Sequence, residues 1–359
     1  MSVAKEQILK AKKEKQSIKC VVWDLDHTLW NGVLLEDEQV VLNDEAVKLV
    51  KEMDRRGILN SISSKNNQDA ALAKLEELGL AEYFLYPEIN WNPKSMSVAN
   101  ISRSLNIGLD TFAFVDDSEF ERGEVAHELP QVLCLDAAEM SQMWASPNFQ
   151  PPFITPESAL RRKMYMSDVQ RKAAEKDFQG HNEEFLAKLN MTFQIGYATE
   201  DDLQRAEELT VRTNQLNTTG YTYSYAELDA LRQDHEGHLL LVANLDDKYG
   251  TYGTIGLSLV EKGEQHWTIK LLLMSCRVMS RGVGTIMMSY IMQQAKAAGA
   301  TLRAEFVPNG RNRMMFVTYK FGGFKQVDKE GDLVVLEHDL VEIQALPEYV
   351  NIHLPTNER

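Results

Sequence analysis

Two aspartates follow a short apolar run near the start of the sequence. Residues 21–23 are apolar, Asp24 and Asp26 come directly after them, and Thr28 stands two positions later. A strand over this run would place both carboxyl groups at its C-terminal end and on one face, because side chains alternate along a strand. Two such acids can hold a Mg²⁺ ion while one oxygen attacks a phosphorus atom. The pattern favours phosphoryl transfer over its alternative, a pair of acids in a surface turn.

Further polar groups suited to phosphate accompany three later apolar runs. They are the hydroxyls of Ser63 and Ser64, the amine of Lys94, and the carboxyl groups of Asp116 and Asp117. A hydroxyl and an ammonium group can bind phosphoryl oxygens, while the late carboxylates can complete a metal site. Singly, such residues are usually parts of turns or solvated surfaces. Their order at four successive predicted strand ends indicates one shared site.

This series of motifs resembles the HAD (haloacid dehalogenase) superfamily of phosphotransferases over residues 17–136. The resemblance implies that Asp24 is the nucleophile, and that Asp26 is the acid/base whose backbone carbonyl also binds Mg²⁺. It implies that Ser64 and Lys94 bind the phosphoryl oxygens, with Ser63 as the alternative hydroxyl.

The same resemblance implies a metal site and two substrate contacts. Asp117 would bind Mg²⁺ directly and Asp116 would support it, while Thr28 and Asn66 would contact the substrate. The predicted metal site therefore comprises Asp24, Asp26, Asp116 and Asp117.

The spacing of these motifs leaves no room for a large cap domain. Only 34 residues separate Leu29 from Ser64, and 29 separate Ser64 from Lys94. Ordinary helices over residues 43–56 and 68–79 fill much of both gaps. We therefore expect an open, capless site, which suits a macromolecular substrate or one tethered to another protein.

The second half of the sequence changes in character after a proline-containing stretch. Residues 137–189 form a linker with a basic helix at 157–178, interpreted either as a solvated connection or as a docking face for an acidic partner. Strands are predicted at 191–197, 238–245, 252–260, 266–274 and 301–306, with helices at 201–213, 286–298 and 309–319. This order resembles the GNAT acyltransferase fold over residues 190–340. The predicted fold is thus a capless HAD-like α/β domain with a parallel sheet (1–136), a linker (137–189) and a GNAT-like α/β domain (190–359).

The predicted acyltransferase domain carries several candidate site residues. Arg281, Gly282 and Gly284 lie between a strand and a helix, where backbone N–H groups can bind a phosphate. Met279 stands where the usual pyrophosphate loop has Gln or Arg, so the loop departs from the pattern for acetyl-CoA. The remaining candidates are the amides of Asn214 and Asn217, interpreted either as a helix stop or as a lining for a hydroxylated acyl group, and the thiol of Cys276 beside Arg277.

Motifs from both halves together resemble the FkbH-like family over nearly the full length. They lie at residues 23–36, 64–67, 114–117, 212–217 and 275–278. The resemblance implies formation of glyceryl-acyl carrier protein from 1,3-bisphosphoglycerate, with the pantetheine arm of an acyl carrier protein as partner and Mg²⁺ as cofactor. The product would feed polyketide biosynthesis. The first acyl acceptor is either Cys276 or the carrier's thiol, because Leu25 stands where some relatives have a cysteine. A stand-alone phosphatase is the alternative function.

The composition excludes other classes of function. The 359 residues carry a net charge of −15, which argues against binding nucleic acid through its phosphates. Cys20, Cys134 and Cys276 are too few and too scattered for a disulfide framework or a zinc site. The charged first segment is no signal peptide, and no apolar run is long enough to span a membrane. We therefore expect a cytoplasmic protein.

Overall fold

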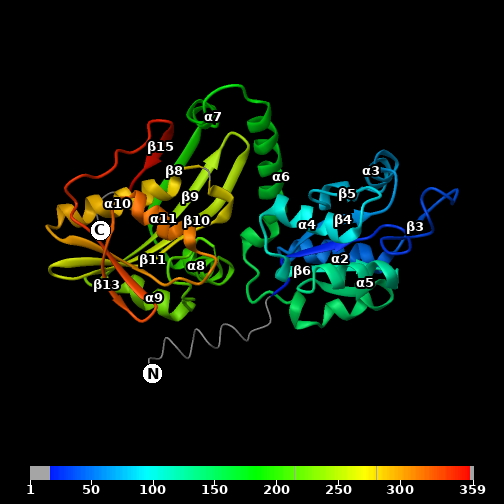
Figure 1. The fold of residues 1–359 in the computed structure, drawn as a ribbon, viewed down its shortest axis with the longest axis horizontal. Helices are drawn as coiled ribbons and strands as arrows, with labels where there is room; N and C mark the ends of the chain where they lie inside the picture. Colours follow the sequence, from blue (N-terminus) through cyan, green and yellow to red (C-terminus); the bar gives the residue numbers. More distant parts are fainter. Residues whose placement is uncertain (1–16, 214, 280, 356–359) are drawn as a thin grey trace. The chain divides into compact units, whose positions relative to one another are not determined.

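The computed structural model describes residues 17–213, 215–279 and 281–355 of the 359-residue chain. Contacts divide the chain into two compact units, Met1–Met166 and Ser167–Arg359 (Figure 1). The division lies inside helix α6 (Pro156–Asp177). Residues 137–166, which the sequence assigned to a linker, therefore contact the first unit.

The first unit is built on a five-stranded parallel sheet in the order β5-β4-β1-β6-β7. The strands are β1 (Cys20–Trp23), β4 (Leu59–Ser64), β5 (Glu88–Ile89), β6 (Phe112–Asp116) and β7 (Leu133–Asp136). Because all five run in parallel, their carboxyl ends meet at one edge of the sheet. The central strand β1 therefore delivers Asp24 to the middle of that edge.

Helices cover both faces of this sheet. They are α2 (Asp44–Arg55), α3 (Gln68–Glu77), α4 (Lys94–Leu105) and α5 (Glu119–Glu128). Alternate residues of β1 enter different cores: Val21 and Trp23 pack with α2 and α3, whereas Cys20 and Val22 pack with α4 and α5. Because both faces of β1 are buried, every position along the strand needs an apolar residue, which explains its continuous apolar sequence.

A short hairpin lies in the first of the two gaps that the sequence predicted to be too short for a cap domain. It comprises β2 (Trp30–Asn31) and β3 (Val41–Leu42), which lie between β1 and α2. Gly32 in its turn has a φ of +99°, a conformation that side chains with a Cβ rarely adopt. In the described part of the chain, the segments between β1 and α4 contain this hairpin, helices and short strands, but no further domain.

The second unit is built on an eight-stranded mixed sheet in the order β13-β14-β12-β11-β10-β9-β8-β15. The strands are β8 (Met191–Tyr197), β9 (His238–Asp247), β10 (Gly250–Lys262), β11 (His266–Met274), β12 (Thr301–Phe306), β13 (Lys325–Glu330), β14 (Leu333–His338) and β15 (Val350–His353). Helices α8 (Glu200–Arg212) and α9 (Tyr225–Gln233) pack on one face, and α10 (Val283–Ala297) and α11 (Arg313–Phe321) on the other.

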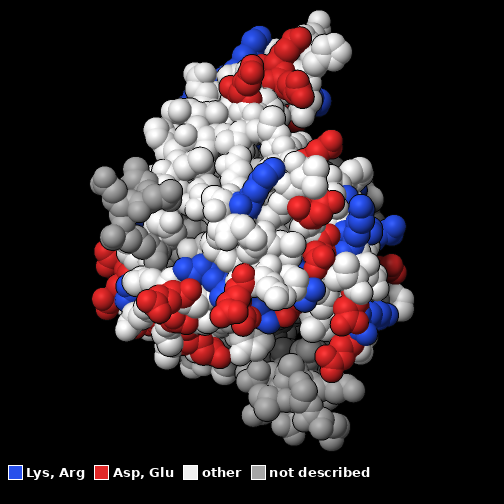
Figure 2. All heavy atoms as spheres, turned by 90° about the vertical axis from the view of Figure 1, so that its left-hand side faces the viewer, with Lys and Arg blue, Asp and Glu red and all other residues white. Residues whose placement is uncertain are grey.

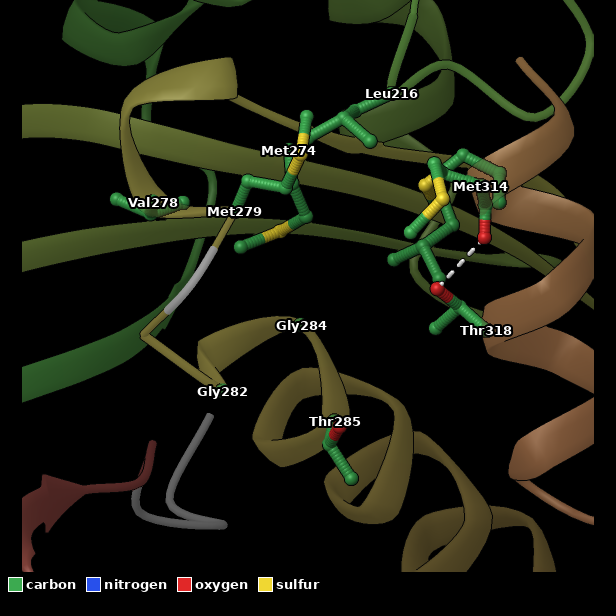
Figure 3. A pocket seen from close by; sticks show the side chains of 11 residues that line it. Leu216, Met274, Val278, Met279, Gly282, Gly284, Thr285, Met314 and Thr318 are labelled. Carbon is green, nitrogen blue, oxygen red and sulfur yellow. Dashed lines mark hydrogen bonds between the residues drawn. The ribbon is translucent and has the colours of Figure 1, made fainter. Parts of the chain in front are cut away.

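A strap from residues 216–218 fills the gap where β11 and β12 separate. These parallel strands pair only as far as Ile269 opposite Ala304. Beyond that point the Met274 backbone N–H donates to the Leu216 carbonyl (3.0 Å), and the Thr218 N–H donates to the Leu272 carbonyl (3.2 Å). Figure 3 places Leu216 beside Met274. The strap therefore occupies backbone hydrogen-bonding groups at the end of β11.

Basic residues of helix α6 are paired within the molecule. Arg161 donates to the Gly57 carbonyl (2.7 Å) and Arg162 forms an ion pair with Asp54 (3.0 Å). Arg171 is buried and bonds Asp247 through two nitrogens (2.6 and 2.9 Å). These three arginines therefore neither form a solvated surface nor offer a docking face for an acidic partner.

Charges of both signs are mixed on the surface drawn in Figure 2. Lys and Arg side chains lie among Asp and Glu side chains there. None of the helices in the described residues has the length and apolar character needed to cross a membrane. The predicted fold class is confirmed: a HAD-like parallel α/β unit is followed by a GNAT-like unit with a mixed sheet.

Candidate functional site

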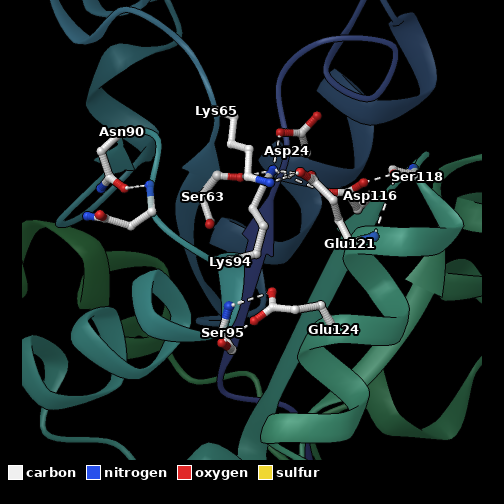
Figure 4. Close-up of polar contacts among 11 residues, drawn as sticks. Asp24, Ser63, Lys65, Asn90, Lys94, Ser95, Asp116, Ser118, Glu121 and Glu124 are labelled. Carbon is white, nitrogen blue, oxygen red and sulfur yellow. Dashed lines mark hydrogen bonds and ion pairs between the residues drawn. The ribbon is translucent and has the colours of Figure 1, made fainter.

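The amine of Lys94 lies at the centre of a buried polar cluster at the carboxyl edge of the first sheet. Asp24 directly follows β1, and its backbone N–H donates to the Val115 carbonyl (2.9 Å). Lys94, the first residue of α4, donates from Nζ to Asp24 Oδ1 (2.5 Å), the Ser63 carbonyl (2.7 Å) and Asp116 Oδ2 (3.1 Å) (Figure 4). The Lys94 side chain is 2% exposed. Three strand ends and one helix start thus converge on a single ammonium group.

Glu121 completes the cluster, and the sequence reasoning missed it. Its Oε2 lies 3.1 Å from Lys94 Nζ, and its Oε1 lies 2.8 Å from the amine of Lys65. Ser118 and Glu121 have the spacing of a capping box, in which the glutamate would bond its own helix start. Ser118 does accept from the Glu121 N–H (3.4 Å), but the Glu121 carboxylate contacts the two lysines instead. The sequence feature that could have indicated Glu121 is an acidic residue in the first turn of a helix that follows an acidic strand end.

The charges in this cluster shift one another's pKa values. Burial raises the pKa of Asp24, and the ammonium of Lys94 offsets this only in part. Burial and the charge of Asp24 raise the pKa of Asp116 to about 7. Burial alone would lower the pKa of Lys94, but the charges of Asp24, Asp116 and Glu121 outweigh it and raise that pKa. For Glu121, burial is outweighed by Lys94 and Lys65, which lower its pKa.

Three carboxylates of the cluster are arranged as a divalent cation would require. Oxygens of Asp24, Asp116 and Glu121 all lie within 4.8 Å of one another. Mg²⁺ prefers oxygen ligands and binds through a few carboxylates while keeping several waters. An additional positive charge would also oppose the raised pKa of Asp116, whose causes are burial and a neighbouring carboxylate. The donor set therefore fits Mg²⁺.

Asp26 lies beside the cluster with both carboxylate oxygens bonded. Oδ1 accepts from Trp30 Nε1 (2.7 Å) and from the Leu34 backbone N–H (3.1 Å), while Oδ2 accepts from Asn66 Nδ2 (3.0 Å). The structure thus brings together Asp26 and Asn66, two residues that the sequence predicted for this site. Two of the three donors belong to the segment around the β2–β3 hairpin, so that segment fixes the orientation of Asp26.

The remaining predicted residues of this site differ in burial. Asp117 is exposed and, within the described residues, is outside the group of three close carboxylates. Ser63 and Ser64 are both buried, but the Ser63 carbonyl, rather than its hydroxyl, faces Lys94 in Figure 4. The choice of Ser64 over Ser63 as the hydroxyl for phosphate stays a prediction. The hydroxyl of Thr28 is buried without a hydrogen-bond partner in the described structure.

The second unit holds an apolar pocket of about 110 Å³ between the end of β11, the start of α10 and α11 (Figure 3). Four methionines contribute to its wall: Met274, Met279, Met314 and Met315. Leu216 of the strap, Gly282 and Gly284 lie in the same wall. Methionine side chains adapt their shape to apolar groups, so the lining suits an apolar ligand more than a hydroxylated one.

Arg281, Asn217 and Gly282 are residues that the sequence predicted for the acyltransferase site. Arg281 is buried and forms an ion pair with Glu175 (3.2 Å). Asn217 is buried and accepts from two backbone N–H groups of its own turn (3.1 and 2.9 Å), while Asn214 lies outside the described residues. Gly282 has a φ of +74°, and a Cβ there would lie 2.7 Å from the Tyr349 hydroxyl. A larger residue would therefore clash at the start of α10.

The three cysteines occupy different surroundings. Burial raises the pKa of the Cys20 thiol well above its usual range. Burial also raises the pKa of Cys134 to about 11, with Arg122 acting in the opposite direction. Cys276 is half-buried in the short 3₁₀ turn Cys276–Val278 that follows β11. Thiolates are the reactive form, so the first two cysteines are poor nucleophiles.

Comparisons with solved structures find matches that each cover less than half of this chain. One match is the N-terminal part of a Bacteroides fragilis protein, containing a phosphatase domain and complexed with Mg, which is 28% identical. This match covers 41% of this chain and 44% of the Bacteroides chain, with a TM-score of 0.34. A HAD-superfamily hydrolase from Ehrlichia chaffeensis is 15% identical over 34% of this chain and 87% of its own, with a TM-score of 0.28. The PaiA N-acetyltransferase from Thermoplasma acidophilum, in complex with coenzyme A, is 15% identical over 41% of this chain and 98% of its own, with a TM-score of 0.33.

These similarities are limited in extent. The part aligned with the Bacteroides protein spans less than half of that structure's length. Protein-family models give no match to the sequence, and curated proteins give none either. Because the TM-scores are below 0.5, the assignment of fold rests on the strand order and pairing described above.

Proposed function

We propose that this protein forms glyceryl-acyl carrier protein from 1,3-bisphosphoglycerate, by acyl transfer to a thiol and Mg²⁺-dependent removal of a phosphate. The product would supply a three-carbon unit, such as a methoxymalonyl-type extender, to polyketide biosynthesis. The observation that carries the proposal is the cluster of Asp24, Asp116 and Glu121 around the Lys94 amine. The presence of a GNAT-like unit in the same chain supports the acyl-transfer half.

The chemistry of the substrate divides the work between the two units. 1,3-Bisphosphoglycerate has an acyl phosphate at C1 and a phosphate monoester at C3. Attack by Asp24 on the acyl phosphate would release free glycerate and lose the activation. A thiolate that attacks the C1 carbonyl instead forms a thioester and expels phosphate. The phosphoryl-transfer site then has the C3 monoester as its substrate.

Phosphate removal would proceed through Asp24. One oxygen of Asp24 attacks the phosphorus atom and forms an aspartyl-phosphate, and water then hydrolyses it. The Lys94 ammonium, already in contact with Asp24, can bind a phosphoryl oxygen without moving far. Asp26 would protonate the leaving oxygen and later activate the water. To contact the substrate, the Asp26 carboxylate must give up one of its three hydrogen bonds. The bond from the Leu34 N–H is the longest of the three.

Mg²⁺, held by Asp24, Asp116 and Glu121, would neutralise charge on the phosphoryl oxygens. Asp117, which is exposed, and the backbone carbonyl of Asp26 remain proposed as further ligands. Asp24 and Glu121 also contact Lys94 directly. The same ammonium therefore keeps the three carboxylates together in the absence of the ion.

The thiol that accepts the acyl group is either Cys276 or the pantetheine of the carrier. Burial disfavours the thiolates of Cys20 and Cys134. Cys276 lies directly beyond the strand that ends in the pocket residue Met274, with Arg277 next to it. A neighbouring cation stabilises a thiolate, which supports Cys276 as the first acceptor.

The test is intact-protein mass spectrometry of the enzyme and a pantetheinylated carrier after incubation with Mg²⁺ and 1,3-bisphosphoglycerate. The wild-type protein should produce a glyceryl adduct on the carrier. An additional adduct on the enzyme, absent from Cys276→Ala, would establish a cysteine relay. Full carrier loading by Cys276→Ala would remove the relay while leaving the overall reaction intact.

One observation favours a second function, a HAD phosphatase whose second unit only binds a partner. The pocket beside β11 is apolar, and the strap at 216–218 uses backbone groups there that could otherwise bind a hydroxylated acyl group. Under this alternative, phosphate would be released from a small molecule or a phosphoprotein. No adduct would then form on either the carrier or the enzyme.

A further inference from the structure

Helix α4 begins without a cap of its own. Its N-cap residue is Pro93, which has no side-chain hydrogen bond to the helix, and its first turn contains no acidic residue. The first backbone N–H groups of a helix need partners, and the start of a helix favours negative charge. This particular start matters because its first residue is Lys94.

Glu124, a residue of α5, supplies the missing cap. Its Oε2 accepts from the Ser95 backbone N–H (3.1 Å), and its Oε1 accepts from the Ser95 hydroxyl (Figure 4). Ser95 is 9% exposed, so little water competes for these bonds. Hydrogen bonds to a charged acceptor are stronger than those between neutral groups. Glu124 therefore fixes the residue next to Lys94 by two contacts.

Helix α5 is itself fixed to the ends of strands β6 and β7. Arg122 donates from Nη1 to the Asp116 carbonyl (2.8 Å) and from Nη2 to Asp136 at the end of β7 (2.5 Å). Glu121 and Glu124 are three positions apart, so they project from the same face of α5. One therefore contacts the amine of Lys94 while the other contacts the backbone beside it.

We propose that Glu124 is a positioning residue that sets where the Lys94 amine lies. The inference rests on the proposed phosphoryl-transfer function, in which Lys94 binds the phosphoryl group. The buried Lys94 side chain reaches Asp24 and the Ser63 carbonyl from a helix start whose position Glu124 determines. A displacement of about 1 Å at a catalytic group can cost about 100-fold in rate.

Steady-state hydrolysis of p-nitrophenyl phosphate with Mg²⁺ tests this directly. Glu124→Ala should lower kcat by about 10- to 100-fold and change KM by less than about threefold, because a displaced Lys94 amine chiefly loses its contact with the charge that develops in the transition state. Glu124→Gln keeps an acceptor oxygen and should recover most of kcat. Glu128→Ala, an exposed acid at the end of the same helix, is the matched control and should behave as wild type.

A double-mutant cycle in thermal unfolding separates this inference from the proposed function. If Glu124 acts through Lys94, the melting temperature of Glu124→Ala with Lys94→Met should fall by less than the sum of the two single decreases. Additive decreases would overturn the positioning role, as would a kcat for Glu124→Ala equal to that of Glu128→Ala. A wild-type protein that hydrolyses no phosphate ester would refute the proposed function, and the cycle alone would then decide the inference.

Discussion

Replacement of Lys94 by methionine tests the charge arrangement of the site. The Lys94 amine contacts Asp24 at 2.5 Å and both Asp116 and Glu121 at 3.1 Å. At an effective dielectric constant of about 20, each contact represents about 5–7 kcal/mol of attraction, most of which desolvation offsets. Removing one partner from a buried ion pair typically costs about 3–5 kcal/mol. For a unit of this size, that loss corresponds to a decrease in melting temperature of about 6–20 °C.

The loss should depend on pH and on Mg²⁺. The three carboxylates left by Lys94→Met can take up protons, so the destabilisation should be smaller at about pH 5 than at about pH 8. Mg²⁺ should raise the melting temperature of Lys94→Met more than that of wild type, because the ion replaces the missing charge.

Circular dichroism melting curves at both pH values, with EDTA and with Mg²⁺, provide the measurement. Lys74→Met is the control, because Lys74 pairs with Glu77 on the surface of α3 and should cost less than about 1 kcal/mol. Equal losses for the two variants would show that the buried contacts of Lys94 add no more stability than a surface ion pair. A loss for Lys94→Met that ignored both pH and Mg²⁺ would contradict the charge arrangement described for the site.

Three further changes have defined outcomes. Glu121→Gln should weaken Mg²⁺ binding about tenfold or more by isothermal titration calorimetry, whereas Glu119→Gln on the same helix turn should not; equal affinities would exclude Glu121 as a ligand. Because folding raises the pKa of Asp116 from 3.8 to about 7, its stabilising contribution in metal-free protein is present in full below pH 3.8 and is lost as the pH rises through about 7. In urea unfolding, the free energy of unfolding of Asp116→Asn should therefore increase relative to that of wild type by up to about 4 kcal/mol as the pH rises over that interval. A difference that stays constant with pH would contradict the raised pKa of Asp116. Asn312 donates to the carbonyls of Asn217 (3.0 Å), Thr218 (3.3 Å) and Val307 (2.9 Å), so Asn312→Ala should destabilise the second unit by about 1–3 kcal/mol in thermal unfolding. Asn351→Ala, at an exposed position of β15, is the control, and an equal loss in the two variants would contradict a structural role for the strap.

The strand ends of the first unit were predictable because their signals are local. Each apolar run is short and ends in a polar group, and parallel strands bring such ends to one edge. The meeting of Asp24, Lys94 and Asp116 follows from that arrangement. Glu121 was not predicted because its spacing from Ser118 is equally typical of a helix cap. Only the position of Lys94 decides which partner the carboxylate takes.

The second unit was less predictable in detail. Its strands and main helices follow the apolar periodicity, so the fold class could be predicted. The strap could not, because its bonds join residues 216–218 to residues 272–274, and no local pattern reports such a pairing. The amide-rich sequence around Asn217 indicated a turn or a ligand contact; in the structure its side chain bonds its own turn. Whether that segment also contacts a substrate stays a prediction.

The mass of the acyl group that reaches the carrier distinguishes glyceryl transfer from phosphate release alone. Wild-type protein and Asp24→Asn would each be incubated with Mg²⁺, 1,3-bisphosphoglycerate and a pantetheinylated acyl carrier protein, and the carrier measured by intact-protein mass spectrometry. Wild type should yield a glyceryl adduct, and Asp24→Asn an adduct that retains the C3 phosphate, because acyl transfer does not need Asp24. Release of phosphate by wild type with no adduct on the carrier or the enzyme would exclude glyceryl transfer.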